Sequence, residues 1–158
     1  MAKFTLIAEP GSQEYIYRRQ FDFPQADVFK AYTDPLLIPK WWGPSICTTM
    51  VDKMDVRPGG LWRFVQTNLR GVCFGFHGVF HTVEPYSLLI NTLEYEGKPG
   101  NVSLNTVTFK AGQGETELIR HAVFQSEADR DLILNYNMEQ GLSQSMDRLE
   151  ALLQNMHP

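Results

Sequence analysis

The sequence predicts an α+β fold in which a curved antiparallel sheet of six or seven strands wraps around one long C-terminal helix. Segments rich in β-branched and aromatic residues follow one another from residue 48 to residue 124, with short turns between them. After them, residues 138–155 carry an apolar stripe at helical spacing. The length of 158 residues predicts a single domain, residues 1–158, because domains commonly hold about 100–150 residues.

The N-terminal part predicts one or two strands followed by two short helices. Residues 4–8 are a candidate strand, and residues 14–21 form the first full strand. Pro24 stands where a helix can begin, since its missing N–H costs nothing in the first turn. Asp34-Pro35 predicts the start of the second helix, an N-cap followed by proline at the first helical position. Gly43-Pro44 ends it.

Six further strands are predicted at residues 48–56, 61–67, 72–84, 88–95, 102–110 and 115–124. The turns between them contain Gly, Pro, Asn and Ser, as at Pro58-Gly59-Gly60. Connections this short force antiparallel neighbours, because a parallel crossover needs a dozen residues or more. These strands are therefore predicted to form a meander.

The C-terminal part predicts a short helix and then the long one. Ser126 with Asp129 three residues later resembles a capping box. The stripe of the long helix consists of Met138, Leu142, Met146, Leu149 and Leu153. The concave face of the sheet is the only large apolar surface predicted to cover it.

Alternation within the strands predicts which side chains face this helix. Gly78 would allow a sharp bend of its strand or the close approach of a ligand. The candidate ligand-binding residues, expected to line a cavity between sheet and helix, are Trp62, Phe64, Phe74, Phe76, Phe80, Met138, Leu142 and Met146. The same pattern also fits a packed core, and the methionines would suit an adaptable wall. The polar groups that could orient a ligand are Asn91, Asn105, Arg120 and Ser145, while Trp41 and Trp42 fit either structural plugs or gates.

No catalytic residue, metal site or cofactor is predicted. His77 and His81 lie opposite the aromatic face, and four residues along a strand span about 13 Å, too far to share a zinc ion. The sequence has no G-x-S-x-G elbow, and Cys47 lacks a cysteine-protease context. Cys47 and Cys73 show neither metal-type spacing nor a disulfide framework.

Charge and hydropathy limit the classes of partner that the protein is expected to bind. The net charge is −4, with 14 basic residues among 18 acidic ones, which argues against a nucleic-acid binder. No segment reaches the roughly 18 apolar residues of a membrane span, and the first residues hold no signal-peptide core. We therefore expect a cytoplasmic protein, and an exposed edge strand could pair two copies into a homodimer.

Segments along nearly the whole chain resemble those of a known family and occur in the same order. The matching segments are residues 19–24 (RQFDFP), 28–35 (VFKAYTDP), 41–44 (WWGP), 55–60 (DVRPGG), 62–64 (WRF), 76–80 (FHGVF), 84–85 (EP), 124–131 (FQSEADRD) and 146–149 (MDRL). They resemble the activator-of-heat-shock-protein-90-ATPase homologue-like proteins of the START-like (polyketide cyclase and Bet v allergen) superfamily. The resemblance implies the helix-grip fold with a pocket between sheet and helix. The eukaryotic co-chaperone is similar only in its C-terminal domain, and these residues hold no counterpart of its N-terminal domain.

Three functions are compatible with these observations. The leading hypothesis is a non-catalytic protein that binds a small hydrophobic molecule, such as a lipid, polyketide or aromatic metabolite. The second is a cyclase- or hydrolase-type enzyme that uses the same cavity and requires a buried acid or base beside it. The third is a protein-interaction module with a chaperone partner, which requires an exposed apolar patch.

Overall fold

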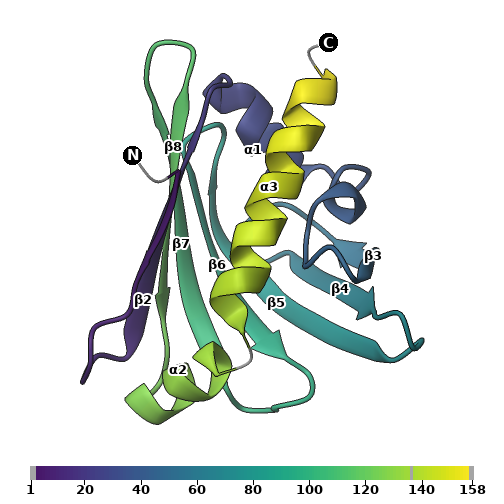
Figure 1. The fold of residues 1–158 in the computed structure, drawn as a ribbon, viewed down its shortest axis with the longest axis vertical. Helices are drawn as coiled ribbons and strands as arrows, with labels where there is room; N and C mark the ends of the chain where they lie inside the picture. Colours follow the sequence, from purple (N-terminus) through teal and green to yellow (C-terminus); the bar gives the residue numbers. More distant parts are fainter. Residues whose placement is uncertain (1–2, 136, 157–158) are drawn as a thin grey trace.

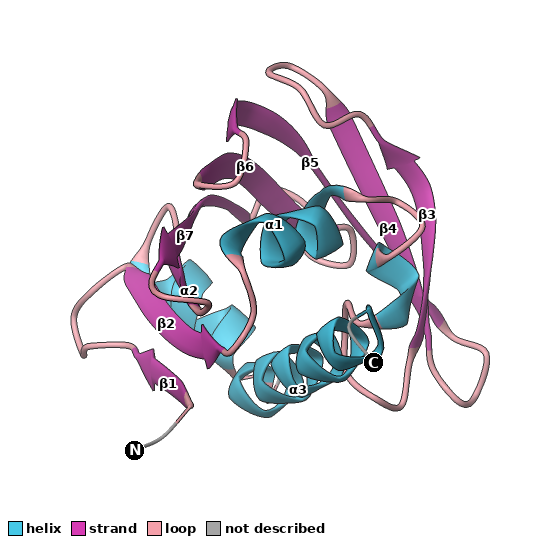
Figure 2. Cartoon of the chain, turned by 90° about the horizontal axis from the view of Figure 1, so that it is seen from above, coloured by secondary structure: helices cyan, strands magenta, loops and turns pink. Residues whose placement is uncertain are grey.

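The computed structural model describes residues 3–135 and 137–156, and it confirms the predicted α+β class with a sheet curved around helices (Figures 1 and 2). Its eight strands form one antiparallel sheet in the order β1-β2-β8-β7-β6-β5-β4-β3. The strands are β1 (Phe4–Ile7), β2 (Glu14–Phe21), β3 (Thr48–Met54), β4 (Leu61–Thr67), β5 (Cys73–Glu84), β6 (Leu88–Tyr95), β7 (Val102–Ala111) and β8 (Thr116–Val123).

The predicted meander corresponds to β3–β8, each paired with the next strand. The expected six or seven strands become eight because the candidate first strand is real: Phe4 of β1 pairs with Arg19 of β2. β2 pairs along its whole length with β8, from Glu14↔Val123 to Phe21↔Thr116. This long-range pairing places β1 at one edge of the sheet and β3 at the other.

The helices are α1 (Gln25–Thr33), the 3₁₀ turn η1 (Ile38–Lys40), α2 (Glu127–Leu134) and α3 (Met138–Met156). The second predicted helix is reduced to η1. The Asp34 carboxylate accepts a hydrogen bond from the Leu36 N–H (2.9 Å), as an N-cap does, but only the 3₁₀ turn at Ile38–Lys40 follows it. The capping prediction for α2 is confirmed: Ser126 Oγ accepts a hydrogen bond from the Asp129 N–H at 3.1 Å. None of the helices in the described part of the chain has the length and hydropathy that a membrane crossing requires.

Helix α3 crosses the concave side of the sheet, and α1 lies within the same curve (Figure 2). The buried apolar side chains of α3 are Met146, Leu149, Leu152 and Leu153. They belong to one hydrophobic cluster with the buried residues of the sheet and of α1. Polar contacts hold α3 to the loop that follows η1. Ser145 Oγ donates to the Trp41 carbonyl oxygen (3.1 Å), and Arg148 Nη1 donates to that of Gly43 (2.9 Å).

Candidate functional site

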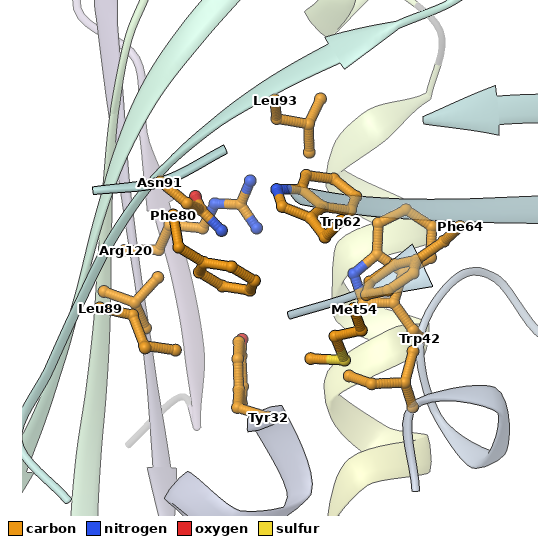
Figure 3. A pocket seen from close by; sticks show the side chains of 12 residues that line it. Tyr32, Trp42, Met54, Trp62, Phe64, Phe80, Leu89, Asn91, Leu93 and Arg120 are labelled. Atoms are coloured by element: carbon orange, nitrogen blue, oxygen red, sulfur yellow. The ribbon is translucent and has the colours of Figure 1, made fainter. Parts of the chain in front are cut away.

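An internal cavity lies between the concave face of the sheet and the segment that runs from α1 through η1 to Trp42 (Figure 3). The sheet supplies most of its wall, from β3 to β8. Twelve residues line it: Tyr32, Ile38, Trp42, Met54, Trp62, Phe64, Phe80, Leu89, Asn91, Leu93, Val107 and Arg120. The wall is therefore mainly aromatic and aliphatic, with three polar side chains.

The cavity is small. Its free space is about 40 Å³ for the centre of a water molecule, which is room for about three waters. Pockets that hold drug-sized ligands commonly measure roughly 300–1,000 Å³. The cavity as it stands therefore suits a compact molecule, and anything much larger requires the side chains of the wall to move.

The aromatic part of the wall depends on a close approach between two strands. Trp62 in β4 pairs in register with Gly78 in β5. Its indole Nε1 passes over that glycine and donates a hydrogen bond to the Thr92 carbonyl oxygen of β6 at 3.1 Å. The ring centroid of Trp62 lies 4.7 Å from that of Phe64, and the centroid of Trp42 lies 5.1 Å from Phe64. Because Gly78 has no side chain, the rings of Trp42, Trp62 and Phe64 can pack together as one wall of the cavity.

Trp41 and Trp42 have different roles. Trp41 is 1% exposed, and its Nε1 donates to the Ala31 carbonyl oxygen at 2.9 Å. It therefore anchors the segment between α1 and β3 in the core. Trp42 instead lines the cavity, so of the two indoles only this one belongs to the candidate site.

The polar side chains gather around Arg120, whose guanidinium points into the cavity near Asn91 (Figure 3). Arg120 Nε and Nη2 donate to Asn105 Oδ1 at 3.3 and 3.1 Å. Arg120 also forms a hydrogen bond with Tyr17, whose hydroxyl lies 3.5 Å from that of Tyr32. Asn105, completely buried, is itself fixed, because its Nδ2 donates to Ser103 Oγ at 3.1 Å.

Burial determines the protonation states in this group. Desolvation, followed by the charge of Tyr17, raises the pKa of Tyr32 well above its ordinary value. Desolvation alone would lower the pKa of Arg120, but Tyr15, Tyr17 and Tyr32 hold it above the ordinary value. At neutral pH the site therefore contains the neutral phenol of Tyr32 and the positively charged guanidinium of Arg120.

The structure brings three of the eight expected site residues together at this cavity: Trp62, Phe64 and Phe80. Phe76 does not line the cavity but packs against Trp42, with 5.3 Å between the ring centroids. Phe74 packs against Tyr95 of β6, at 6.4 Å between centroids. The remaining three are on α3 and do not line the cavity: Met146 is part of the core, and Met138 and Leu142 pack against it.

The α3 residues are absent from the wall because the segment from α1 to Trp42 faces the sheet in their place. It contributes Tyr32, Ile38 and Trp42, which no alternation in a strand could single out as site residues. Leu89 and Leu93 were also missed as site residues, although they share a strand face with Asn91, which the period-two pattern of β6 could have revealed.

The three histidines among the described residues lie outside the cavity. His77 is hydrogen-bonded to Glu96 (2.9 Å), His121 to Glu14 (2.8 Å), and His81 is exposed. Within residues 3–135 and 137–156, no three His, Cys, Asp or Glu side chains are grouped to hold a metal ion. Cys47 is buried and Cys73 exposed, and both are free thiols.

Comparison with known proteins places the chain among relatives of the same fold. The family model described as Activator of Hsp90 ATPase homolog 1-like protein matches residues 22–154. A crystal structure of a protein from Rhodobacter sphaeroides is 24% identical, with a TM-score of 0.88 over 98% of this chain and 99% of that chain. A solution structure from Arthrobacter aurescens is 20% identical, with a TM-score of 0.88 over 96% and 91%. The AHSA1 protein from Silicibacter pomeroyi is 22% identical, with a TM-score of 0.76 over 91% and 99%. No curated protein matches the chain.

Proposed function

We propose that this chain, which belongs to the Activator of Hsp90 ATPase homolog 1-like family, binds a compact hydrophobic molecule in its internal cavity without transforming it. The observation that carries the proposal is the wall itself. Nine apolar side chains from the sheet and from the segment 38–42 converge on one enclosed space, beside a few polar groups. Apolar lining with few convergent polar groups is the usual composition of small-molecule sites.

The arrangement supports binding better than catalysis. Turnover by acid–base chemistry would need a group of suitable pKa beside the ligand. The cavity wall contains no histidine, aspartate or glutamate. Its ionisable side chains are a guanidinium and a phenol whose pKa is raised well above its ordinary value, and neither exchanges a proton readily near neutral pH.

The proposal keeps Trp62, Phe64 and Phe80 as ligand-binding residues and adds Trp42 and Met54 to them. Trp62 and Phe80 lie on opposite sides of the free space (Figure 3), so their rings can contact both faces of a small molecule. Met54 has a flexible thioether that can adapt to different shapes.

Binding can be tested with toluene as a neutral apolar probe, followed by thermal unfolding and by the NMR shifts of the indole N–H groups. A ligand that binds only the folded state raises the unfolding temperature with concentration. The Leu89→Phe variant would fill the cavity, since Leu89 is 2% exposed and lines it. Leu104→Phe is the matched control, because Leu104 is 48% exposed on the other face.

We expect toluene to stabilise the unmodified protein and the Leu104→Phe variant but not the Leu89→Phe variant, with folding of both variants checked by circular dichroism. Equal stabilisation of both variants, or no effect on the unmodified protein, would show that the cavity does not bind apolar molecules.

A further inference from the structure

Arg120, which is partly buried, differs from the buried arginines Arg19 and Arg130 in having no acidic partner. Arg19 is 2% exposed and pairs with Asp147 at 2.8 Å, and Arg130 is 3% exposed and pairs with Asp131 at 3.0 Å. In the described part of the chain, no Asp or Glu oxygen lies within 4.0 Å of an Arg120 nitrogen. The cavity wall around it also lacks any carboxylate.

The neutral partners of Arg120 orient its guanidinium but do not compensate its charge. Asn105 Oδ1 accepts from Nε and Nη2, and the Tyr17 hydroxyl oxygen accepts a further hydrogen bond from the guanidinium. A guanidinium has five N–H donors, so donors remain for a molecule in the cavity. Removing a cation from water without an opposite charge is costly, and an anion bound beside it would offset that cost.

A second polar group faces the same space. The Asn91 side chain lies next to Arg120 in the wall (Figure 3) and has no hydrogen bond to any residue that the structure describes. Asn91 and Asn105 pair in register on neighbouring strands, so the same face of the sheet presents both amides. The Tyr32 hydroxyl points into the cavity from the opposite side (Figure 3).

We propose that the ligand of this cavity is a compact aromatic or aliphatic carboxylate. Its head group binds Arg120 and Asn91, and its apolar body packs between Trp62 and Phe80. This inference rests on the proposed function and adds the charge and the orientation of the ligand to it. Carboxylates are favoured because the planar guanidinium binds both of their oxygens in parallel hydrogen bonds. The free volume of about 40 Å³ is smaller than the roughly 150 Å³ of an apolar cavity that binds benzene, so one ring is the upper limit for the body, and its entry requires side chains of the wall to move.

The test compares three one-ring probes of similar size: benzoate, its neutral amide benzamide, and toluene. Their dissociation constants are measured by NMR titration at neutral pH with the unmodified protein and with two variants. Arg120→Gln removes the cavity cation. Arg18→Gln makes the same change of net charge on the outer face of β2, where Arg18 is exposed and forms an ion pair with Glu117 at 3.6 Å.

We expect the unmodified protein to bind benzoate at least about tenfold more tightly than benzamide, because hydrogen bonds to a charged partner are the stronger ones. Arg120→Gln should remove this difference, whereas Arg18→Gln should leave it unchanged. The comparison of benzoate with benzamide needs no variant, so it decides the question even if Arg120→Gln does not fold.

Equal binding of benzoate and benzamide by the unmodified protein, with toluene bound, would overturn the carboxylate inference and leave the proposed function standing. Benzoate binding that survives Arg120→Gln would overturn it as well. If none of the three probes binds, the proposed function fails, and the carboxylate inference fails with it.

Discussion

Gly78→Ala is expected to destabilise the protein and to displace the aromatic wall of the cavity. A Cβ at position 78 would lie 2.6 Å from Trp62 Nε1 and closer still to the carbonyl oxygen of Thr92. The nearer atom is backbone in the neighbouring strand, so it cannot move aside without disturbing the sheet. Trp62 would have to leave the position from which it donates to Thr92.

The magnitude follows from two contributions. Overpacking a well-packed interior by a methyl group costs about 1–3 kcal/mol, and the lost hydrogen bond of Trp62 costs about 1 kcal/mol more. We therefore expect the free energy of unfolding to fall by about 2–4 kcal/mol for Gly78→Ala. The matched control is Gly141→Ala in α3, where a new Cβ meets nothing within 4 Å. There alanine should stabilise the protein by about 0.5–1 kcal/mol, because glycine is the poorer helix former.

The assay is urea unfolding followed by far-ultraviolet circular dichroism, which does not depend on the environment of the displaced indole. Tryptophan emission of the folded variants is recorded separately, and it should change for Gly78→Ala but not for Gly141→Ala. If Gly78→Ala unfolds within about 0.5 kcal/mol of the unmodified protein, the close approach of Trp62 to Gly78 does not constrain the fold and the reasoning is refuted.

Two further predictions concern charged groups. Arg130→Met should lower the free energy of unfolding by about 2–4 kcal/mol, because the buried guanidinium donates to the carbonyl oxygens of Glu9 and Glu14 at 2.8 and 2.9 Å. The control is Arg70→Met, since Arg70 is exposed. An equal loss of stability in both variants would contradict this prediction. Hydrogen bonds from Arg63 and then His77 lower the pKa of Glu96 from 4.5 to about 2. Its ionised form therefore stabilises the folded state above pH 4.5. The Glu96→Gln variant should be less stable than the unmodified protein at pH 7, by a difference that shrinks as the pH falls toward about 2. Urea unfolding over this pH range checks it, and a difference independent of pH would disprove the linkage.

The fold was largely predictable because its signals are local. Turn residues and alternation located the strands of the meander, and Ser126 correctly marked the start of α2. The two deviations arise where the local signal was ambiguous. Asp34-Pro35 makes the hydrogen bond of a helix start, but the structure continues it only as the 3₁₀ turn Ile38–Lys40. Residues 4–7 are too short to be a strand alone, and they become one by pairing with β2.

The candidate site was predictable only in part. Trp62, Phe64 and Phe80 follow from the alternation of β4 and β5, which places them on the concave face. The prediction that α3 lines the cavity opposite them assumed that the longest amphipathic helix covers that face alone. Tyr32 and Trp42 occupy the place instead.

The sequence by itself determined the class of fold, the meander and the apolar character of the interior, since hydrophobic periodicity and turn chemistry act over a few residues. The tertiary structure decided which segment fills the concave side of the sheet and which groups surround each buried charge. Arg120 acquires its neutral neighbours because β8 lies between β2 and β7, which brings Tyr17 to it from a distant part of the chain, next to Asn105 of the preceding strand. A neighbour such as Tyr17 is set by the pairing of strands that are far apart in the sequence. Local periodicity carries no information about that pairing.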